Sequence, residues 1–171
     1  MESTEAANDL NGVDVTQLEA FRTSVRRDPS LADRRATVVA EWLNGSRSRV
    51  EYDGQTMYLG GEDDLNAMQA LLGCLAACDI DLVAMHAARL GVALEKLRVE
   101  TSGVFNGARY LGLDSDHGPG YQHIDYRVRL AAPSATDAQI EELRRLCERA
   151  SPIGDTLTRA VPMTLHLHVD R

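Results

Sequence analysis

The feature that most constrains the fold is a long, uninterrupted apolar stretch in the middle of the chain. Between Asn66 and Leu90 there is no proline and a single glycine, and apolar residues occupy most helical faces between Met68 and Leu75. This pattern predicts a long helix that is buried rather than amphipathic, with Gly91 as its C-terminal cap. One small sheet cannot cover such a helix on both sides, which favours a second subunit.

Length and charge exclude several classes of partner. The longest stretch without a charged residue, Leu65–Cys78, falls short of the roughly 20 apolar residues that a membrane-spanning helix needs. The formal net charge is −8, with 26 acidic against 18 basic residues. Nucleic acid or an anionic membrane surface would require a basic footprint. We therefore expect no nucleic acid and no membrane among the partners.

The cysteine count indicates the compartment. The chain has 3 cysteines, an odd number that is too small for a disulfide framework. The N-terminus, Met1–Asp9, is polar and acidic and lacks the apolar run of a secretory signal. We expect a protein of the reducing cytoplasm, where any disulfide is transient or catalytic.

Strands and helices surround the long helix. Residues 1–12 indicate a flexible arm, and residues 13–171 a single domain that begins with a helix at about 14–28, where Thr16 and Glu19 have capping-box spacing. Asn-Gly and Asp-Gly pairs predict two hairpin turns. We expect strands at 36–42, 46–52, 56–59, 94–105, 124–130 and 163–169, and further helices at 136–150 and 155–159. This order predicts an α+β fold with antiparallel sheets.

Cys78 is the first candidate for a chemical role. A free cysteine in an apolar helix is commonly a small buried hydrophobe, whereas a reactive thiol needs a cation or a helix N-terminus beside it. Cys78 lies well inside the predicted helix, beyond the reach of the helix dipole. Asp81, on a similar face, opposes thiolate formation. A reactive Cys78 therefore requires a cation from elsewhere in the fold.

Three segments resemble motifs of one family. The sequence Asn-Ala-Met-Gln-Ala-Leu-Leu-Gly-Cys-Leu-Ala-Ala-Cys, which starts at Asn66, is similar to the central-helix signature of the OsmC/Ohr family. Residues 42–49 resemble the first hairpin of that family, and residues 151–157 resemble the motif that carries its second cysteine. The resemblance covers about residues 36–169. It implies an OsmC-like fold, an intertwined homodimer in which antiparallel sheets enclose the long helices, with active sites at the subunit interface.

The resemblance also implies a chemistry, the reduction of organic or inorganic hydroperoxides in the oxidative stress response. A thiolate attacks the peroxide and becomes a sulfenic acid, which condenses with a second cysteine; an arginine held by a glutamate stabilises the thiolate. Cys78 falls on the peroxide-reacting cysteine and Arg47 on the activating arginine, with Arg49 selected by a small shift of register.

Two positions depart from the family pattern. Met68 stands where the family has its glutamate, and Ser151 stands where it has the resolving cysteine. Methionine cannot hold an arginine by charge-assisted hydrogen bonds. We therefore expect Arg47 to turn toward another acid, with Asp79, Asp81 and Glu41 as candidates.

A serine cannot form a disulfide, so the usual resolving step is closed at Ser151. Cys74, one helical turn before Cys78, is one candidate for a replacement, although a disulfide within a regular helix is strained. Cys147, one turn before Ser151, is another. An external thiol reductant is the third.

The remaining side chains indicate no metal and no cofactor. His166 and His168 alternate on the expected last strand, but no third ligand is evident. Two functions stay open beside a purely structural dimer. One is a thiol peroxidase at Cys78, and the other is a non-catalytic homodimer that binds a small apolar ligand in an interface pocket made more apolar by Met68.

Overall fold

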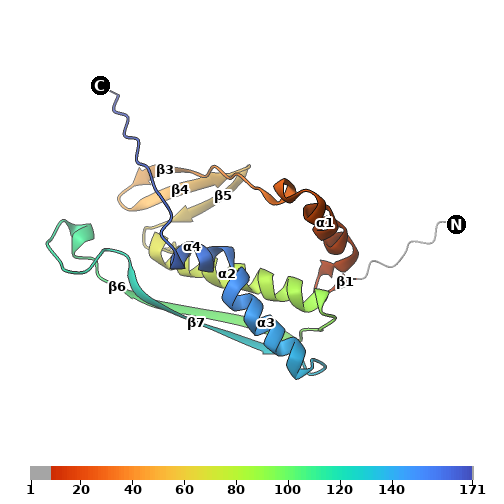
Figure 1. Cartoon of the computed structure of the whole chain (residues 1–171). Coiled ribbons are helices and arrows are strands. Elements are labelled where there is room, and N and C mark those ends of the chain that lie inside the picture. Colours follow the sequence, from red (N-terminus) through yellow and green to blue (C-terminus); the bar gives the residue numbers. More distant parts are fainter. Residues whose placement is uncertain (1–8, 171) are drawn as a thin grey trace.

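The long helix predicted from the sequence organises the fold. The computed structural model describes residues 9–170, and in it α2 (Ala67–Arg89) runs through the centre of the chain (Figure 1). Asn66 caps its start in a capping box with Gln69. Gly91 follows its end with a φ of +72°, a left-handed conformation that suits glycine and stops the helix.

A two-stranded sheet and two helices pack on α2. β6 (Lys96–Phe105) and β7 (Tyr121–Ala131) form an antiparallel hairpin beneath α2 (Figure 1). α3 (Asp137–Ala150) and α4 (Pro152–Thr158) follow and pack against α2 and each other. The best-buried cluster of hydrophobic side chains lies where α2 ends and α3 begins, and its members are Ala87, Val92 and Leu143.

A second sheet lies at the other side of α2 in Figure 1 and consists of β3 (Val39–Asn44), β4 (Arg47–Tyr52) and β5 (Gln55–Leu59). Its two turns are the predicted ones, at Gly45 and Gly54, both with positive φ. Large apolar side chains of this sheet remain exposed, among them Trp42 at 76% and Met57 at 50%. The α+β class with antiparallel sheets is confirmed.

The N-terminal elements differ in detail from the prediction. β1 (Asp9–Leu10) and β2 (Val13–Asp14) form a tight ladder, so the expected arm is structured from Asp9 onward, and residues 1–8 lie outside the described part. α1 (Val15–Arg27) begins where expected, but the side chain of Asp14 caps it by accepting the Gln17 N–H. The capping box of Thr16 and Glu19 was therefore wrong, because Asp14 offers an N-cap oxygen two residues earlier.

The strand expected at the C-terminus does not form within the described chain. Residues 160–170 have no regular secondary structure, and Met163, Leu165 and Leu167 are between 82% and 93% exposed. The prediction of a strand at 163–169 was wrong for the single chain, because this segment pairs with no strand in the described residues. Two short 3-10 turns complete the fold, at Pro29–Ala32 and Arg109–Leu111.

α2 is also the described helix that satisfies the length and composition of a membrane span. The central helix of a folded core satisfies the same test. Asp79 and Asp81 lie near its middle, and Asp79 is fully buried against other parts of the chain. These two carboxyl groups and the packing of α2 on β6 and α3 favour a core helix.

Candidate active site

The candidate site centres on Cys78, which lies near the middle of α2 and is half-buried. Its Sγ is 3.7 Å from Oγ of Ser151, a residue 73 positions later in the sequence. Ser151 is 6% exposed and joins the end of α3 to the start of α4. The structure therefore brings Cys78, at the position of the peroxide-reacting cysteine, into contact with Ser151, at the position of the resolving cysteine.

The helix start at Ser151 fixes the orientation of its side chain. Ser151 is the N-cap of α4, and its Oγ accepts the N–H of Gly154 at 3.1 Å. Pro152 occupies the first helical position, which suits its fixed φ. The cap uses a lone pair of the hydroxyl oxygen and leaves the hydroxyl proton available. Ser151 can therefore donate that proton toward the sulfur of Cys78.

Asp79 is an unusual neighbour of this site. Its side chain is 0% exposed, and neither carboxyl oxygen has a hydrogen-bond partner among the described residues. Burial raises the pKa of Asp79 above its ordinary value of 3.8, and the nearby Ser151 hydroxyl partly opposes that shift. Protonation of Asp79 would remove the repulsion that its carboxylate exerts on a Cys78 thiolate. Sequence reasoning considered Asp79 only as a partner for Arg47.

The buried carboxyl of Asp79 also affects the pKa values of two further groups. Burial, and secondly the charge of Asp79, raise the pKa of Tyr126 on β7 and the pKa of Cys147 on α3. Glu148 acts in the same direction on both. The sequence signal for this arrangement was the pair Asp79 and Asp81 inside an otherwise apolar run.

Arg47 takes a different partner from those expected. Its Nε donates to Asp64 Oδ2 at 2.8 Å, and its guanidinium lies over the ring of Tyr58, 4.7 Å from the centroid. The prediction that Arg47 pairs with Asp79 or Asp81 was therefore wrong. The turn after β5 places Asp64 beside Arg47, and this carboxylate takes the guanidinium.

The third expected acid, Glu41, pairs instead with Arg49. Arg49 donates to Glu41 at 2.6 Å across the β3–β4 ladder and lies 3.4 Å from Glu51. Among the described residues, the ion pairs of Arg47 and Arg49 involve no group near Cys78.

The other predicted site residues on α2 lie at its N-terminal half. Met68 is half-buried in the first turn, and its backbone carbonyl accepts the hydroxyl of Tyr121 at 2.8 Å. Cys74 is exposed, one turn before Cys78. Gly73 and Ala77 beside it are also exposed, so this face of α2 is uncovered in the single chain.

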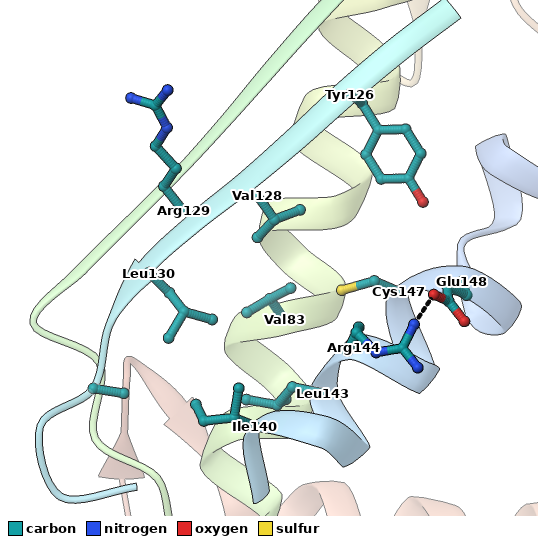
Figure 2. Close-up of a pocket in the computed structure, with 11 residues that line it drawn as sticks. Val83, Tyr126, Val128, Arg129, Leu130, Ile140, Leu143, Arg144, Cys147 and Glu148 are labelled. Atoms are coloured by element: carbon teal, nitrogen blue, oxygen red, sulfur yellow. Dashed lines mark hydrogen bonds and ion pairs between the residues drawn. The ribbon is translucent and has the colours of Figure 1, made fainter. Parts of the chain in front are cut away.

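Cys147 lies in the wall of a cavity of about 790 Å3 between α2, α3 and β7 (Figure 2). Figure 2 shows Val83 of α2 and Leu130 of β7 facing the space, with the ion pair of Arg144 and Glu148 at the α3 side. The lining is mainly aliphatic, and its other members are Tyr126, Val128, Arg129, Ala132, Ile140 and Leu143.

The histidines expected on the last strand lie apart from this site. His168 is 3.2 Å from Asp170 in the exposed C-terminal segment, and His166 precedes it there. Within residues 9–170 no group of three or more His, Cys, Asp and Glu side chains could hold a metal ion.

The fold and site define an α+β protein with a half-buried thiol on its central helix, facing the hydroxyl that starts a later helix. The family model for OsmC-like protein matches residues 60–166. The chain therefore belongs to the OsmC-like family, and the resemblance seen in the sequence is confirmed. The match includes Cys78 and Ser151, whereas the hairpin with Arg47 precedes it.

Solved structures agree with this family at the level of the fold. An OsmC-like protein from Mycoplasma pneumoniae is similar with a TM-score of 0.63 and 19% identity, over 74% of this chain and 89% of that chain. An OsmC-like protein of unknown function from Vibrio cholerae has a TM-score of 0.57 and 13% identity, over 72% and 94%. An organic hydroperoxide resistance protein OsmC from Legionella pneumophila has a TM-score of 0.51 and 14% identity, over 74% and 90%. No curated protein matches the sequence significantly.

Proposed function

We propose that this protein is a thiol peroxidase that reduces organic or inorganic hydroperoxides at Cys78. The observation that carries the proposal is the contact of 3.7 Å between Cys78 Sγ and Ser151 Oγ on a half-buried part of the central helix. Membership in the OsmC-like family supports it. The name of the fold relative from Legionella pneumophila, an organic hydroperoxide resistance protein, agrees with this chemistry.

In the proposed reaction, the Cys78 thiolate attacks one oxygen of the hydroperoxide. The S–O bond forms as the O–O bond breaks, and the leaving alkoxide takes a proton from water and departs as an alcohol. The sulfur loses two electrons to the peroxide and becomes a sulfenic acid. The Ser151 hydroxyl donates a hydrogen bond to the sulfur, because its oxygen already accepts from Gly154 and a thiolate carries no proton.

The proposal includes a homodimer, because the single chain leaves much of its surface exposed. The single chain exposes 13504 Å2, whereas a compact monomer of 18.7 kDa exposes roughly 8,300 Å2. The difference is large enough for an obligate dimer interface. Apolar surface is exposed on three elements, namely the sheet β3–β5, the face of α2 with Ala77 and Ile80, and the C-terminal segment with Leu165 and Leu167.

We infer that homodimerisation covers these surfaces and brings Arg47 of the uncovered sheet toward the thiol site. Arg47 would then either leave Asp64 or bind Asp64 and the thiolate together. In both cases it would supply the cation that a reactive Cys78 needs. Sedimentation equilibrium is expected to give a dimer, and a monomer at micromolar concentration would contradict this part of the proposal.

Turnover tests the peroxidase directly. The consumption of cumene hydroperoxide and of hydrogen peroxide is measured with excess dithiothreitol as reductant. We expect Cys78→Ser to abolish consumption and Arg47→Ala to lower it strongly, whereas Cys74→Ser and Cys147→Ser, the matched controls, retain it. Equal consumption by wild type and Cys78→Ser would refute the proposal.

The cavity in Figure 2 favours one second candidate function, the binding of a small apolar ligand. Its volume of about 790 Å3 and its aliphatic lining lie in the range of small-molecule sites. Native mass spectrometry of freshly purified protein tests it. A co-purified apolar molecule that Ile140→Arg removes would support this function, and a ligand-free spectrum would count against it.

A further inference from the structure

The side chain that contacts the Cys78 sulfur from the start of α4 carries a hydroxyl rather than a thiol. Ser151 Oγ lies 3.7 Å from Cys78 Sγ, is 6% exposed, and is held by its cap bond to Gly154. A hydroxyl in this place can hydrogen-bond to an oxidised sulfur but cannot replace the oxygen of a sulfenic acid. Ser151 can therefore hydrogen-bond to a Cys78 sulfenic acid but cannot form a disulfide with it.

The two other cysteines, Cys74 and Cys147, are poorly placed to form a disulfide with an oxidised Cys78. Cys74 lies on the preceding turn of the continuous helix α2. Side chains four residues apart on a helix have Cβ atoms roughly 5–6 Å apart, whereas a disulfide needs about 3.5–4.5 Å. A bridge from Cys74 to Cys78 would therefore unwind a turn of the central helix.

Cys147 is disfavoured for an electrostatic reason. Its thiol lines the apolar cavity, and burial together with Asp79 raises its pKa. The attacking species in thiol chemistry is the thiolate, so Cys147 is a slow partner for an oxidised Cys78. Its orientation in Figure 2, beside Val83 and Leu143, fits a packing role.

We propose that Cys78 works as a single-cysteine centre whose sulfenic acid is resolved by a low-molecular-weight thiol from solution. This inference rests on the proposed peroxidase function and names its reductant. A small thiol reaches a half-buried sulfur more easily than the active site of a protein reductant does, and the cytoplasm expected from the sequence keeps such thiols reduced.

The cycle balances with two thiol molecules for each peroxide. The sulfur of the first thiol attacks the Cys78 sulfenic acid, an S–S bond forms, and the hydroxyl leaves as water with the proton of that thiol. The second thiol attacks the mixed disulfide, and its proton passes to the Cys78 sulfur. The products are the regenerated Cys78 thiol and the oxidised, disulfide form of the small thiol.

Intact-mass spectrometry after one equivalent of cumene hydroperoxide, followed by glutathione as the probe thiol, tests this proposal. In the wild type we expect one added oxygen and then one glutathione adduct on Cys78. In Ser151→Cys we expect the loss of two hydrogens, from an internal disulfide, and the loss of the adduct. Ser151→Ala is expected to shorten the lifetime of the sulfenic acid while still forming the adduct.

The matched control is Ser134→Cys, which adds a thiol on the exposed loop before α3. Gln139 near the start of α3 bonds to the Leu90 carbonyl, and Leu90 lies roughly 18 Å from Cys78 along the helix axis. This variant is expected to form the glutathione adduct as the wild type does.

The outcomes separate the two proposals. An internal disulfide in the wild type that disappears in Cys74→Ser or Cys147→Ser overturns the single-cysteine cycle and leaves the peroxidase intact. A Cys78 that is not oxidised by either peroxide overturns both. An oxidised Cys78 that gives no adduct with glutathione overturns the small-thiol reductant alone.

Discussion

Asp79→Asn is the substitution that probes the buried carboxyl beside Cys78 most cleanly. Asp79 is 0% exposed and has no hydrogen-bond partner among the described residues. Asparagine has nearly the same shape but cannot ionise, so the variant removes the charge and keeps the packing. The difference in unfolding free energy between variant and wild type therefore isolates the ionisation of one group.

The sign follows from the direction of the shift. Burial raises the pKa of Asp79 above its ordinary value of 3.8, so the folded state holds the proton more tightly than the unfolded state. The stabilisation from this proton is fully present below about pH 3.8 and is lost as the pH rises through the folded-state pKa. Over that window the wild type loses up to about 1.4 kcal/mol per pH unit relative to the variant, and above it the difference stays constant.

Urea unfolding from pH 4 to 8, at one fixed protein concentration, measures this difference. We expect the advantage of Asp79→Asn to grow with pH and then to level off. Asp81→Asn, which changes an exposed carboxyl on the same helix, controls for the change in net charge. A constant difference between Asp79→Asn and the wild type across the whole range would refute the account of Asp79 as a buried, unpartnered acid.

Three further substitutions test the core and local contacts elsewhere in the fold. Leu143→Ala, at a position 2% exposed in the core, is expected to cost about 2–5 kcal/mol in urea unfolding, and a loss below 1 kcal/mol would contradict the assigned core. Gly60→Ala is expected to lower the melting temperature, since φ is +78° and a Cβ would stand 2.1 Å from the Ser46 carbonyl oxygen; an unchanged melting temperature would contradict that contact. Asn11→Ala removes two side-chain hydrogen bonds, one from Nδ2 to the Val92 carbonyl and one from the Leu94 N–H to Oδ1, and is expected to cost about 1 kcal/mol for each bond; equal unfolding curves would count against it.

Much of the fold was predictable because the signals are local. The apolar, proline-free run between residues 66 and 90 predicts α2, and the Asn66–Gln69 pair caps it. Glycine turns at Gly45 and Gly54 predict the hairpins of the sheet β3–β5. The ends of helices are harder to predict, as Asp14 and Thr16 show, because several side chains near a helix start can serve as its cap.

Interactions between distant segments were harder to predict. Alternation at 163–169 indicates which side chains could share a face, but a strand also needs a partner strand, and this segment pairs with none among the described residues. The pairing of Arg47 with Asp64 depends on the turn after β5. The contact of Cys78 with Ser151 spans 73 residues, and only the family resemblance brought those two positions together in advance.

The central claim is that Cys78 is the peroxide-reacting thiol, and trapping its sulfenic acid tests that claim most directly. The wild type is treated with cumene hydroperoxide in the presence of dimedone, digested, and mapped by mass spectrometry. The account predicts a single adduct on Cys78, lost in Cys78→Ser and kept in Cys74→Ser and Cys147→Ser. No adduct on Cys78 at millimolar peroxide, or an adduct mainly on another cysteine, would contradict it.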